Sequence, residues 1–204
     1  PTLKTEDKGI MKFLSKKLSA IGFKCTIIKS KGTGTKQALN LYARYGKSKP
    51  HIMYLGHTDI VANLDNWKFP PFKAVVNKGY LTGRGAQDMK GGIACWISAV
   101  SNYIKNNTVN GSISIIISAD EETTGYGCPA VMKYLRKKGE KIDFSIVGEP
   151  TSNKSVGDEI RIGRRGSMNG IISVHGKSGH SAFYGSYINP CTALAKIITK
   201  LKSV

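Results

Sequence analysis

Short apolar runs alternate along the chain with segments whose apolar residues recur at helical spacing. Strands are predicted at 52–55, 112–118 and 144–147, and helices at 89–106 and 128–138. This alternation predicts an α/β fold with a mixed, largely parallel sheet flanked by helices. Sheets of this kind carry their functional residues at the carboxyl ends of the strands.

The N-terminal part predicts a further helix and two further strands. Residues 5–7, Thr-Glu-Asp, form a capping signal ahead of apolar residues at helical spacing, and Gly22 ends this helix. Strand patterns follow at 23–29 and 38–45, and an irregular loop is expected at 63–73.

The character of the chain changes beyond Glu149. Strands are predicted at 159–164 and 168–175 and a helix at 190–202, which together indicate the start of a second domain. The chain begins at Pro1 rather than at methionine, and the last helical pattern runs to its end. We therefore expect a piece of a longer protein.

The chain is strongly basic. Lysine and arginine outnumber acidic residues by 31 to 13, which gives a formal net charge of +18 and is typical of proteins that bind nucleic acid. The lysines are spread over nearly every segment, however, and the densest cluster, at 136–141, ends a helix where cations are favoured. This distribution favours a lysine-rich surface, able to attract an anionic substrate, over a nucleic-acid partner.

The four cysteines lie far apart and form no C-x-x-C pair; they are Cys25, Cys95, Cys128 and Cys191. This spacing indicates neither a zinc knuckle nor a disulfide scaffold and is typical of a reducing cytosol. No stretch reaches the roughly 20 apolar residues that a membrane-spanning helix needs, and no signal peptide is visible. We expect a cytoplasmic protein without a membrane partner.

Four motifs with acidic or histidine residues stand near the ends of the apolar runs. They are His57–Asp59, Asp88–Gly92, Asp120–Glu122 and Gly148–Pro150. One imidazole with several carboxylates is a ligand set suited to a pair of divalent ions that activate water. If folding brings these motifs together, the chain carries a hydrolase site.

Each motif taken alone has a simpler interpretation. Asp59 can orient the imidazole of His57, but a turn with an Asp cap also explains the pair. Asp88, in a glycine-rich bend, can bridge two ions or cap the next helix. Glu121 and Glu122 can divide the roles of base and ligand, or form a solvated acidic turn.

The later polar residues are open to the same two interpretations. Glu149 is held extended by Pro150 and suits a metal ligand, or a buried ion pair with a lysine. Arg164 and Arg165 can bind carboxylates and His180 can polarise a carbonyl, although each also suits an exposed turn.

Taken together, the motifs resemble the dinuclear zinc desuccinylase, deacetylase and aminoacylase family. The residues that carry the resemblance are Gly56–Asp59, Gly83–Gly92, Ser118–Glu122 and Val147–Pro150. It extends over essentially the whole chain, and Gly163–Ser167 is most similar to the desuccinylases. It implies an incomplete zinc aminopeptidase-like catalytic domain at 1–166 and the start of an α+β dimerisation (lid) domain at 167–204.

The resemblance also implies roles for the residues of the centre. His57 and Glu149 hold one zinc ion, Asp88 bridges, and Glu122 holds the second, so that the full-length enzyme carries two Zn²⁺ or Co²⁺ ions per subunit. Glu121 is the general base. The peptide bond after Asp88 is cis in this family.

Further residues take supporting roles under the same resemblance. Asp59 orients the imidazole, while Arg164, Arg165 and Ser167 bind substrate carboxylates. His180 reaches across the interface of a homodimer to stabilise the oxyanion.

The chain also departs from the family pattern. The second metal of the family takes a histidine near the C-terminus of the full enzyme, which this chain does not include. The loop Ile60–Trp67 is short, and Phe183–Tyr184 replaces a common Tyr-Pro pair. We expect the 204 residues alone to be inactive and to bind at most one zinc ion tightly.

The expected reaction is hydrolysis of the succinyl amide of LL-2,6-diaminopimelate in lysine and diaminopimelate synthesis. A small dicarboxylate amide is therefore the expected partner. Within the same family, the alternative reactions are acetylornithine deacetylation, another acyl-amino-acid hydrolysis, or a carboxypeptidase reaction. The alternatives of other classes are a basic nucleic-acid-binding module and a non-catalytic interaction protein on the same fold.

Overall fold

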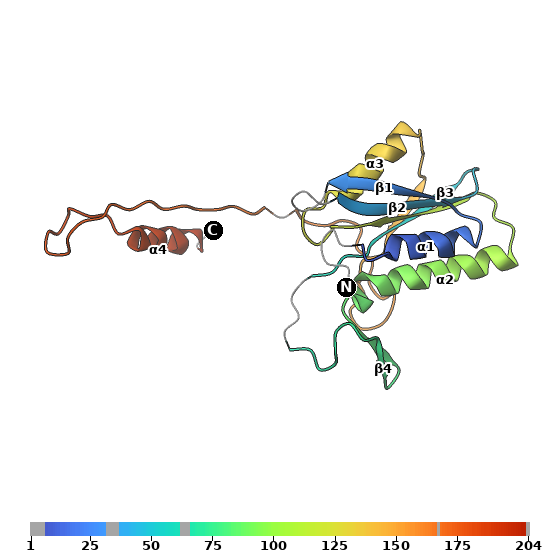
Figure 1. The fold of residues 1–204 in the computed structure, drawn as a ribbon, viewed down its shortest axis with the longest axis horizontal. Coiled ribbons are helices and arrows are strands. Elements are labelled where there is room, and N and C mark those ends of the chain that lie inside the picture. The colour runs from blue at the N-terminus through green and yellow to red at the C-terminus, as the bar shows by residue number, and fades with distance from the viewer. Residues whose placement is uncertain (1–6, 32–36, 62–65, 167, 203–204) are drawn as a thin grey trace. The chain divides into compact units, whose positions relative to one another are not determined.

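The computed structural model describes residues 7–31, 37–61, 66–166 and 168–202 (Figure 1). Contacts divide the chain into two compact units, Pro1–Ile160 and Arg161–Val204. The assignment of 1–166 to a catalytic domain and of 167–204 to a dimerisation domain stays a prediction.

A five-stranded sheet forms the centre of the first unit, in the order β1-β2-β6-β3-β7. Its strands are β1 (Lys24–Lys31), β2 (Gln37–Tyr45), β3 (His51–His57), β6 (Ser112–Ser118) and β7 (Phe144–Val147). β6, β3 and β7 run parallel, whereas β1, β2 and β6 pair antiparallel. The predicted mixed α/β sheet is confirmed.

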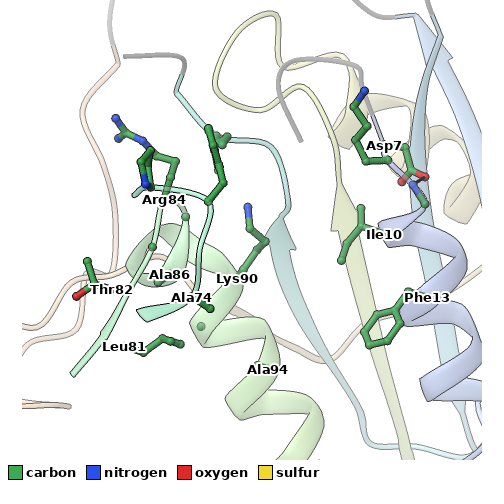
Figure 2. A pocket seen from close by; sticks show the side chains of 18 residues that line it. Asp7, Ile10, Phe13, Ala74, Leu81, Thr82, Arg84, Ala86, Lys90 and Ala94 are labelled. Atoms are coloured by element: carbon green, nitrogen blue, oxygen red, sulfur yellow. Dashed lines mark hydrogen bonds between the residues drawn. The ribbon is translucent and has the colours of Figure 1, made fainter. Parts of the chain in front are cut away.

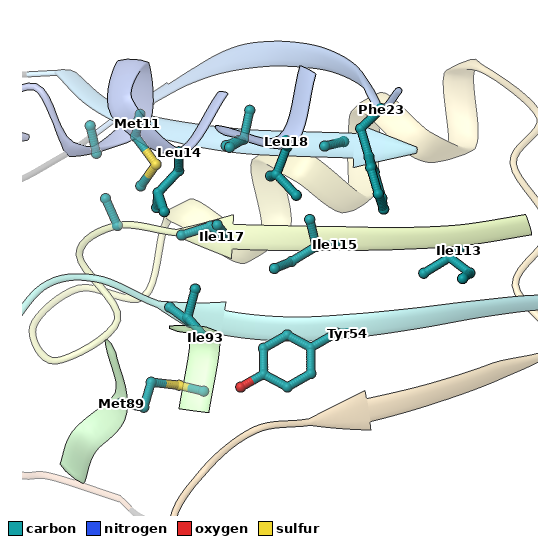
Figure 3. Close-up of a cluster of buried hydrophobic side chains, with 14 residues drawn as sticks. Met11, Leu14, Leu18, Phe23, Tyr54, Met89, Ile93, Ile113, Ile115 and Ile117 are labelled. Carbon is teal, nitrogen blue, oxygen red and sulfur yellow. The ribbon is translucent and has the colours of Figure 1, made fainter. Parts of the chain in front are cut away.

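Helices cover both faces of this sheet. α1 (Ile10–Ser19) and α2 (Gly91–Asn106) lie on one face and α3 (Gly127–Lys137) on the other (Figure 1). Ile115 and Ile117 of β6 belong to the core cluster shared with α1 and α2 (Figure 3), whereas Ile116 packs with α3. β6 is therefore buried on both faces, which explains its three consecutive isoleucines, Ile115–Ile117.

The packing of β6 predicts a large effect of Ile115→Ala on stability. Ile115 is fully buried, and truncation leaves a cavity that costs about 2 to 5 kcal/mol. Denaturant unfolding measures this loss. Ile160→Ala, at a side chain that is 82% exposed, is the control and is expected to change the unfolding free energy by less than about 0.5 kcal/mol. Equal effects of both substitutions would contradict the described core.

The amino end of β3 is anchored by its first residue, His51, which is buried. Its Nδ1 lies 2.8 Å from the main-chain oxygen of Lys141, and its Nε2 lies 2.7 Å from Ser114 Oγ. Its main-chain N–H donates to Asp143 Oδ2 at 2.8 Å. Both ring nitrogens and the backbone of His51 are thereby bound to neighbouring elements.

Asp7, one of the three residues of the predicted capping signal, binds the start of α1. The carboxylate of Asp7 accepts hydrogen bonds from the N–H groups of Gly9, at 2.8 Å, and Met11, at 3.0 Å. Thr5 and Glu6, the other two residues of that signal, lie outside the described residues.

A hairpin that was not predicted precedes the Gly83–Gly92 motif. It consists of β4 (Val75–Asn77) and β5 (Tyr80–Thr82). The two residues between them, Lys78 and Gly79, have φ values of 49° and 80°. The two central residues of such turns favour asparagine and glycine, so Gly79 was the available sequence signal for this turn.

The second unit carries α4 (Pro190–Leu201), which confirms the predicted helix. Asn189 caps it by accepting from Cys191 N–H at 2.9 Å.

The strands predicted at 159–164 and 168–175 are wrong, because the described residues in these ranges form no strand. Several apolar side chains in these ranges are almost fully exposed, and the described residues offer them no partner strand; examples are Ile162, Met168 and Ile171. Of the described helices, none combines the length and apolar character needed to cross a membrane.

Candidate metal centre

Adjacent parallel strands bring most of the predicted site residues to one edge of the sheet. His57 is the last residue of β3, Glu121 and Glu122 lie shortly after β6, and Glu149 follows β7. Asp88 lies within the turn η1 (Ala86–Lys90), where its backbone is extended with a φ of −115° and a ψ of 101°, and not at the end of a strand as predicted.

The donor atoms of these residues converge on His57 Nε2. This nitrogen lies 3.1 Å from Asp88 Oδ1, 3.7 Å from Glu149 Oε1 and 3.9 Å from Glu121 Oε2. His57, Asp88 and Glu149 each offer one donor atom within 4.8 Å of the others, and so do His57, Glu121 and Glu122. Two ligands of one zinc ion lie roughly 3 to 4 Å apart at ordinary bond lengths. The donor set therefore fits a divalent metal in both chemistry and spacing.

Asp59 stands behind the imidazole. Nδ1 of His57 lies 3.1 Å from the main-chain oxygen of Asp59 and 3.5 Å from its Oδ1. The other oxygen, Oδ2, accepts from Glu122 N–H at 2.9 Å. Because Asp59 is buried, it links the orientation of the imidazole to the position of the acidic turn.

The surrounding carboxylates change the acid–base behaviour of His57. Burial disfavours the imidazolium, but the hydrogen bond and charge of Asp59, with the charges of Glu121 and Glu149, outweigh it and raise the His57 pKa to about 9. Burial also opposes ionisation of Asp59, yet hydrogen bonds from His57 and from two backbone N–H groups lower its pKa. Burial and the charge of Asp88 raise the pKa of Glu122. The centre therefore favours an added positive charge, which a metal ion supplies in place of the His57 proton.

The turn that presents Glu121 and Glu122 is held by Asp120 of the same motif and by two threonines that the sequence analysis did not single out. Asp120 has a φ of 66°, and its carboxylate accepts from the hydroxyls of Thr123 and Thr124.

Asn40 of β2 supports the same turn from the neighbouring strand. Its Oδ1 accepts from Ala119 N–H at 3.0 Å, and its Nδ2 donates to the main-chain oxygen of Ile28 and to Ser30 Oγ, both at 3.1 Å. An asparagine between apolar residues of a strand was the available sequence signal, because a buried amide needs partners.

Close packing places Asp88 beside β3. The Asp88–Met89 peptide bond is cis, as the resemblance implied. Met89 is buried, and a Cβ added at Gly56 would lie only 3.0 Å from its Cε. Lys90 Nζ donates to the main-chain oxygen of Thr58 at 2.9 Å. The glycine in the Gly56–Asp59 motif thus permits the close approach of η1 to the strand that carries His57.

The remaining predicted site residues belong to the second unit. Arg164, Arg165 and His180 are exposed there, and His180 Nδ1 accepts from Ala182 N–H at 3.1 Å. Ser167 lies outside the described residues. Their roles stay predictions, as do the separate roles of the residues in the centre.

The first unit is an α/β domain with a candidate metal centre at the carboxyl ends of its parallel strands. The sequence model of peptidase family M20/M25/M40 matches residues 53–200. The chain belongs to this family.

Curated relatives resemble the whole chain. It is 46% identical to a succinyl-diaminopimelate desuccinylase of Pelagibacter ubique and 44% identical to one of Ehrlichia chaffeensis. Each match covers 100% of this chain and 54% of the relative. The chain therefore spans about half the length of the relatives that it matches.

Solved structures share the fold at lower identity. A tripeptidase from Staphylococcus aureus matches with a TM-score of 0.63 and 16% identity, over 97% of this chain and 52% of that one. An M20 family metallo-carboxypeptidase from Sulfolobus solfataricus matches with a TM-score of 0.62 and 22% identity, over 72% and 34% of the two chains.

Proposed function

We propose that the full-length protein is a metal-dependent amide hydrolase that converts N-succinyl-LL-2,6-diaminopimelate to succinate and LL-2,6-diaminopimelate. The observation that carries this proposal is the convergence of Asp88, Glu121 and Glu149 on His57 Nε2. The identity of at least 44% to two desuccinylases over the whole chain supports the substrate.

His57 and Glu149 are the proposed ligands of one metal ion, Asp88 bridges to the second, and Glu122 holds the second. When bound, such ions polarise an amide carbonyl and lower the pKa of water to about 7. Asp59 keeps the proton of the imidazole on Nδ1, which leaves Nε2 free as a ligand atom.

Glu121 is the proposed general base. Its side chain is 49% exposed and its Oε2 lies 3.9 Å from His57 Nε2, so that it borders the centre and can still reach solvent. It accepts a proton from the attacking water and returns that proton to the amine nitrogen when the amide bond breaks.

The proposal extends to the residues that bind the substrate, the metal, the pathway and the compartment. Arg164, Arg165 and Ser167 bind the substrate carboxylates, and His180 stabilises the oxyanion from the other subunit of a homodimer. Zinc or cobalt is the proposed metal, with two ions per subunit, and lysine and diaminopimelate synthesis is the proposed pathway. Four free cysteines support a reducing cytoplasm as the compartment.

Removal of metal from the full-length protein is expected to abolish hydrolysis of N-succinyl-LL-2,6-diaminopimelate, because the water then loses its activating charge. Dialysis against a chelator, followed by stepwise return of Zn²⁺ or Co²⁺, measures this dependence. N-acetylornithine and a dipeptide are comparison substrates and are expected to react more slowly. Full activity after chelation, or faster turnover of a comparison substrate, contradicts the proposal.

A further inference from the structure

A cavity of about 390 Å³ opens directly beside the candidate metal centre. Asp88 and Glu122 line one part of its wall, and Trp67, Tyr80 and Arg84 line another. A substrate bound at the centre therefore has room to extend along this cavity toward Arg84.

Arg84 is held in this wall by its main chain and by a ring contact. Its main-chain N–H donates to the oxygen of Pro71 at 2.8 Å, and its guanidinium carbon lies 4.9 Å from the centroid of the Trp67 ring. Its Nε is buried and has no hydrogen-bond partner in the part of the chain that the structure describes. A buried N–H without an acceptor costs free energy, so an acceptor from a ligand suits this position.

Arg84 supplies positive charge to a cavity that adjoins an acidic centre. Five carboxylates gather at that centre, on Asp59, Asp88, Glu121, Glu122 and Glu149, and bound metal ions would offset much of their charge. Among the described residues that line the cavity, Arg84 is the only lysine or arginine. It is therefore the cationic side chain of this wall that an anionic group extending from the centre would meet.

Arg84 also lines a second cavity, of about 590 Å³, beside the first turn of α1 (Figure 2). Lys90 lines that cavity as well, and Figure 2 shows the charged ends of both side chains directed toward the upper part of the view. The Lys90 ammonium already donates to the oxygen of Thr58. Arg84 is thus the better placed of the two to bind an incoming anion.

We propose that Arg84, stacked on Trp67, binds a carboxylate of the substrate and thereby selects for acidic amides. This inference rests on the proposed function and adds a specificity-determining residue to it. The carboxylate comes either from the acyl chain or from the amino-acid part of the substrate. A guanidinium binds both in the same way, through two parallel N–H···O bonds.

Kinetics of full-length Arg84→Met separate these sources. KM for N-succinyl-LL-2,6-diaminopimelate is expected to rise by about 10-fold or more, with kcat changed far less, because two charge-assisted hydrogen bonds are lost. Replacing the succinyl group by acetyl, or the nearer amino-acid carboxylate by an amide, removes one source at a time. The effect of Arg84→Met is expected to vanish for the substrate that lacks the bound carboxylate.

Arg136→Met, at an exposed arginine of α3, is the matched control and is expected to leave every KM unchanged. Arg84→Lys keeps the charge but loses the planar fork, so an intermediate rise in KM is expected. If Arg84→Met fails to fold, the same kinetics are measured with Arg84→Lys and the same substrates. An equal rise of KM for all substrates, or no rise for any, overturns the inference.

Calorimetric binding separates the inference from the proposed function. Succinate and LL-2,6-diaminopimelate are titrated into the wild type and the Arg84 variant, each beside the diamide in which amide groups replace its carboxylates. At least one acid is expected to bind the variant about 10-fold more weakly, with no change for its amide. Absence of hydrolysis by the wild type refutes the proposed function alone, whereas unchanged binding of both acids refutes the role of Arg84.

Discussion

Glu121→Gln in the full-length protein is expected to lower kcat about 10²- to 10⁴-fold while the metal content stays the same. The amide side chain has the shape of glutamate but cannot accept the proton of the attacking water. Turnover of N-succinyl-LL-2,6-diaminopimelate and metal analysis of the same preparation measure the two quantities. Glu159→Gln, at a glutamate outside the candidate centre, is the control and is expected to keep both the kcat and the metal content of the wild type.

The adjacent Glu122→Gln variant makes this test sharper, because the two glutamates are neighbours with different proposed roles. It is expected to lose bound metal as well as activity. If Glu122→Gln keeps its metal and loses turnover, while Glu121→Gln loses metal, the two roles are exchanged. If both variants turn over at the rate of the wild type, the acidic turn is not part of the site.

His57→Ala is expected to weaken metal binding by more than about 100-fold, a larger effect than the loss of a supporting carboxylate usually has. His57 contributes the only nitrogen donor to the two described groups of potential ligands. Titration of the metal-free protein with Zn²⁺ or Co²⁺ measures the affinity. His175→Gln, at an exposed histidine of the second unit, is the control.

Proton release provides an independent measure of the same interaction. The carboxylates around His57 raise its pKa to about 9, so the metal-free imidazole is protonated at pH 7. A metal ion that binds Nε2 must displace this proton, and affinity should therefore fall as the pH is lowered from 9 to 7. Calorimetry in buffers of different ionisation enthalpy should show about one more proton released by the wild type than by His57→Ala. Equal release by both proteins would mean that His57 is not a ligand.

The sequence predicted best those parts of the fold that local pattern determines. β6 has the predicted bounds, Ser112–Ser118, because its four isoleucines favour a strand and every one of its residues is buried. α4, predicted at 190–202, begins at Pro190 and ends within one residue of the prediction. His57 and Glu149 were placed correctly at the ends of strands, because the carboxyl ends of parallel strands meet at one edge.

Features that depend on distant contacts were not predicted. Asp88 reaches the centre through a turn whose path depends on packing between Met89 and Gly56. The support of the acidic turn by Asn40 joins residues 79 positions apart. The strands expected at 159–164 and 168–175 failed for a related reason, since an extended pattern forms a strand only where a partner supplies hydrogen bonds.

The anchoring of His51 has a consequence for chemistry at the opposite end of β3. The strand is seven residues long, so the two imidazoles lie roughly 20 Å apart along it. A shift of the strand by a single position would turn every side chain to the other face of the sheet and carry His57 away from the carboxylates. The three contacts of His51 oppose that shift, and a histidine at the far end of the strand thereby keeps the proposed ligand His57 in alignment.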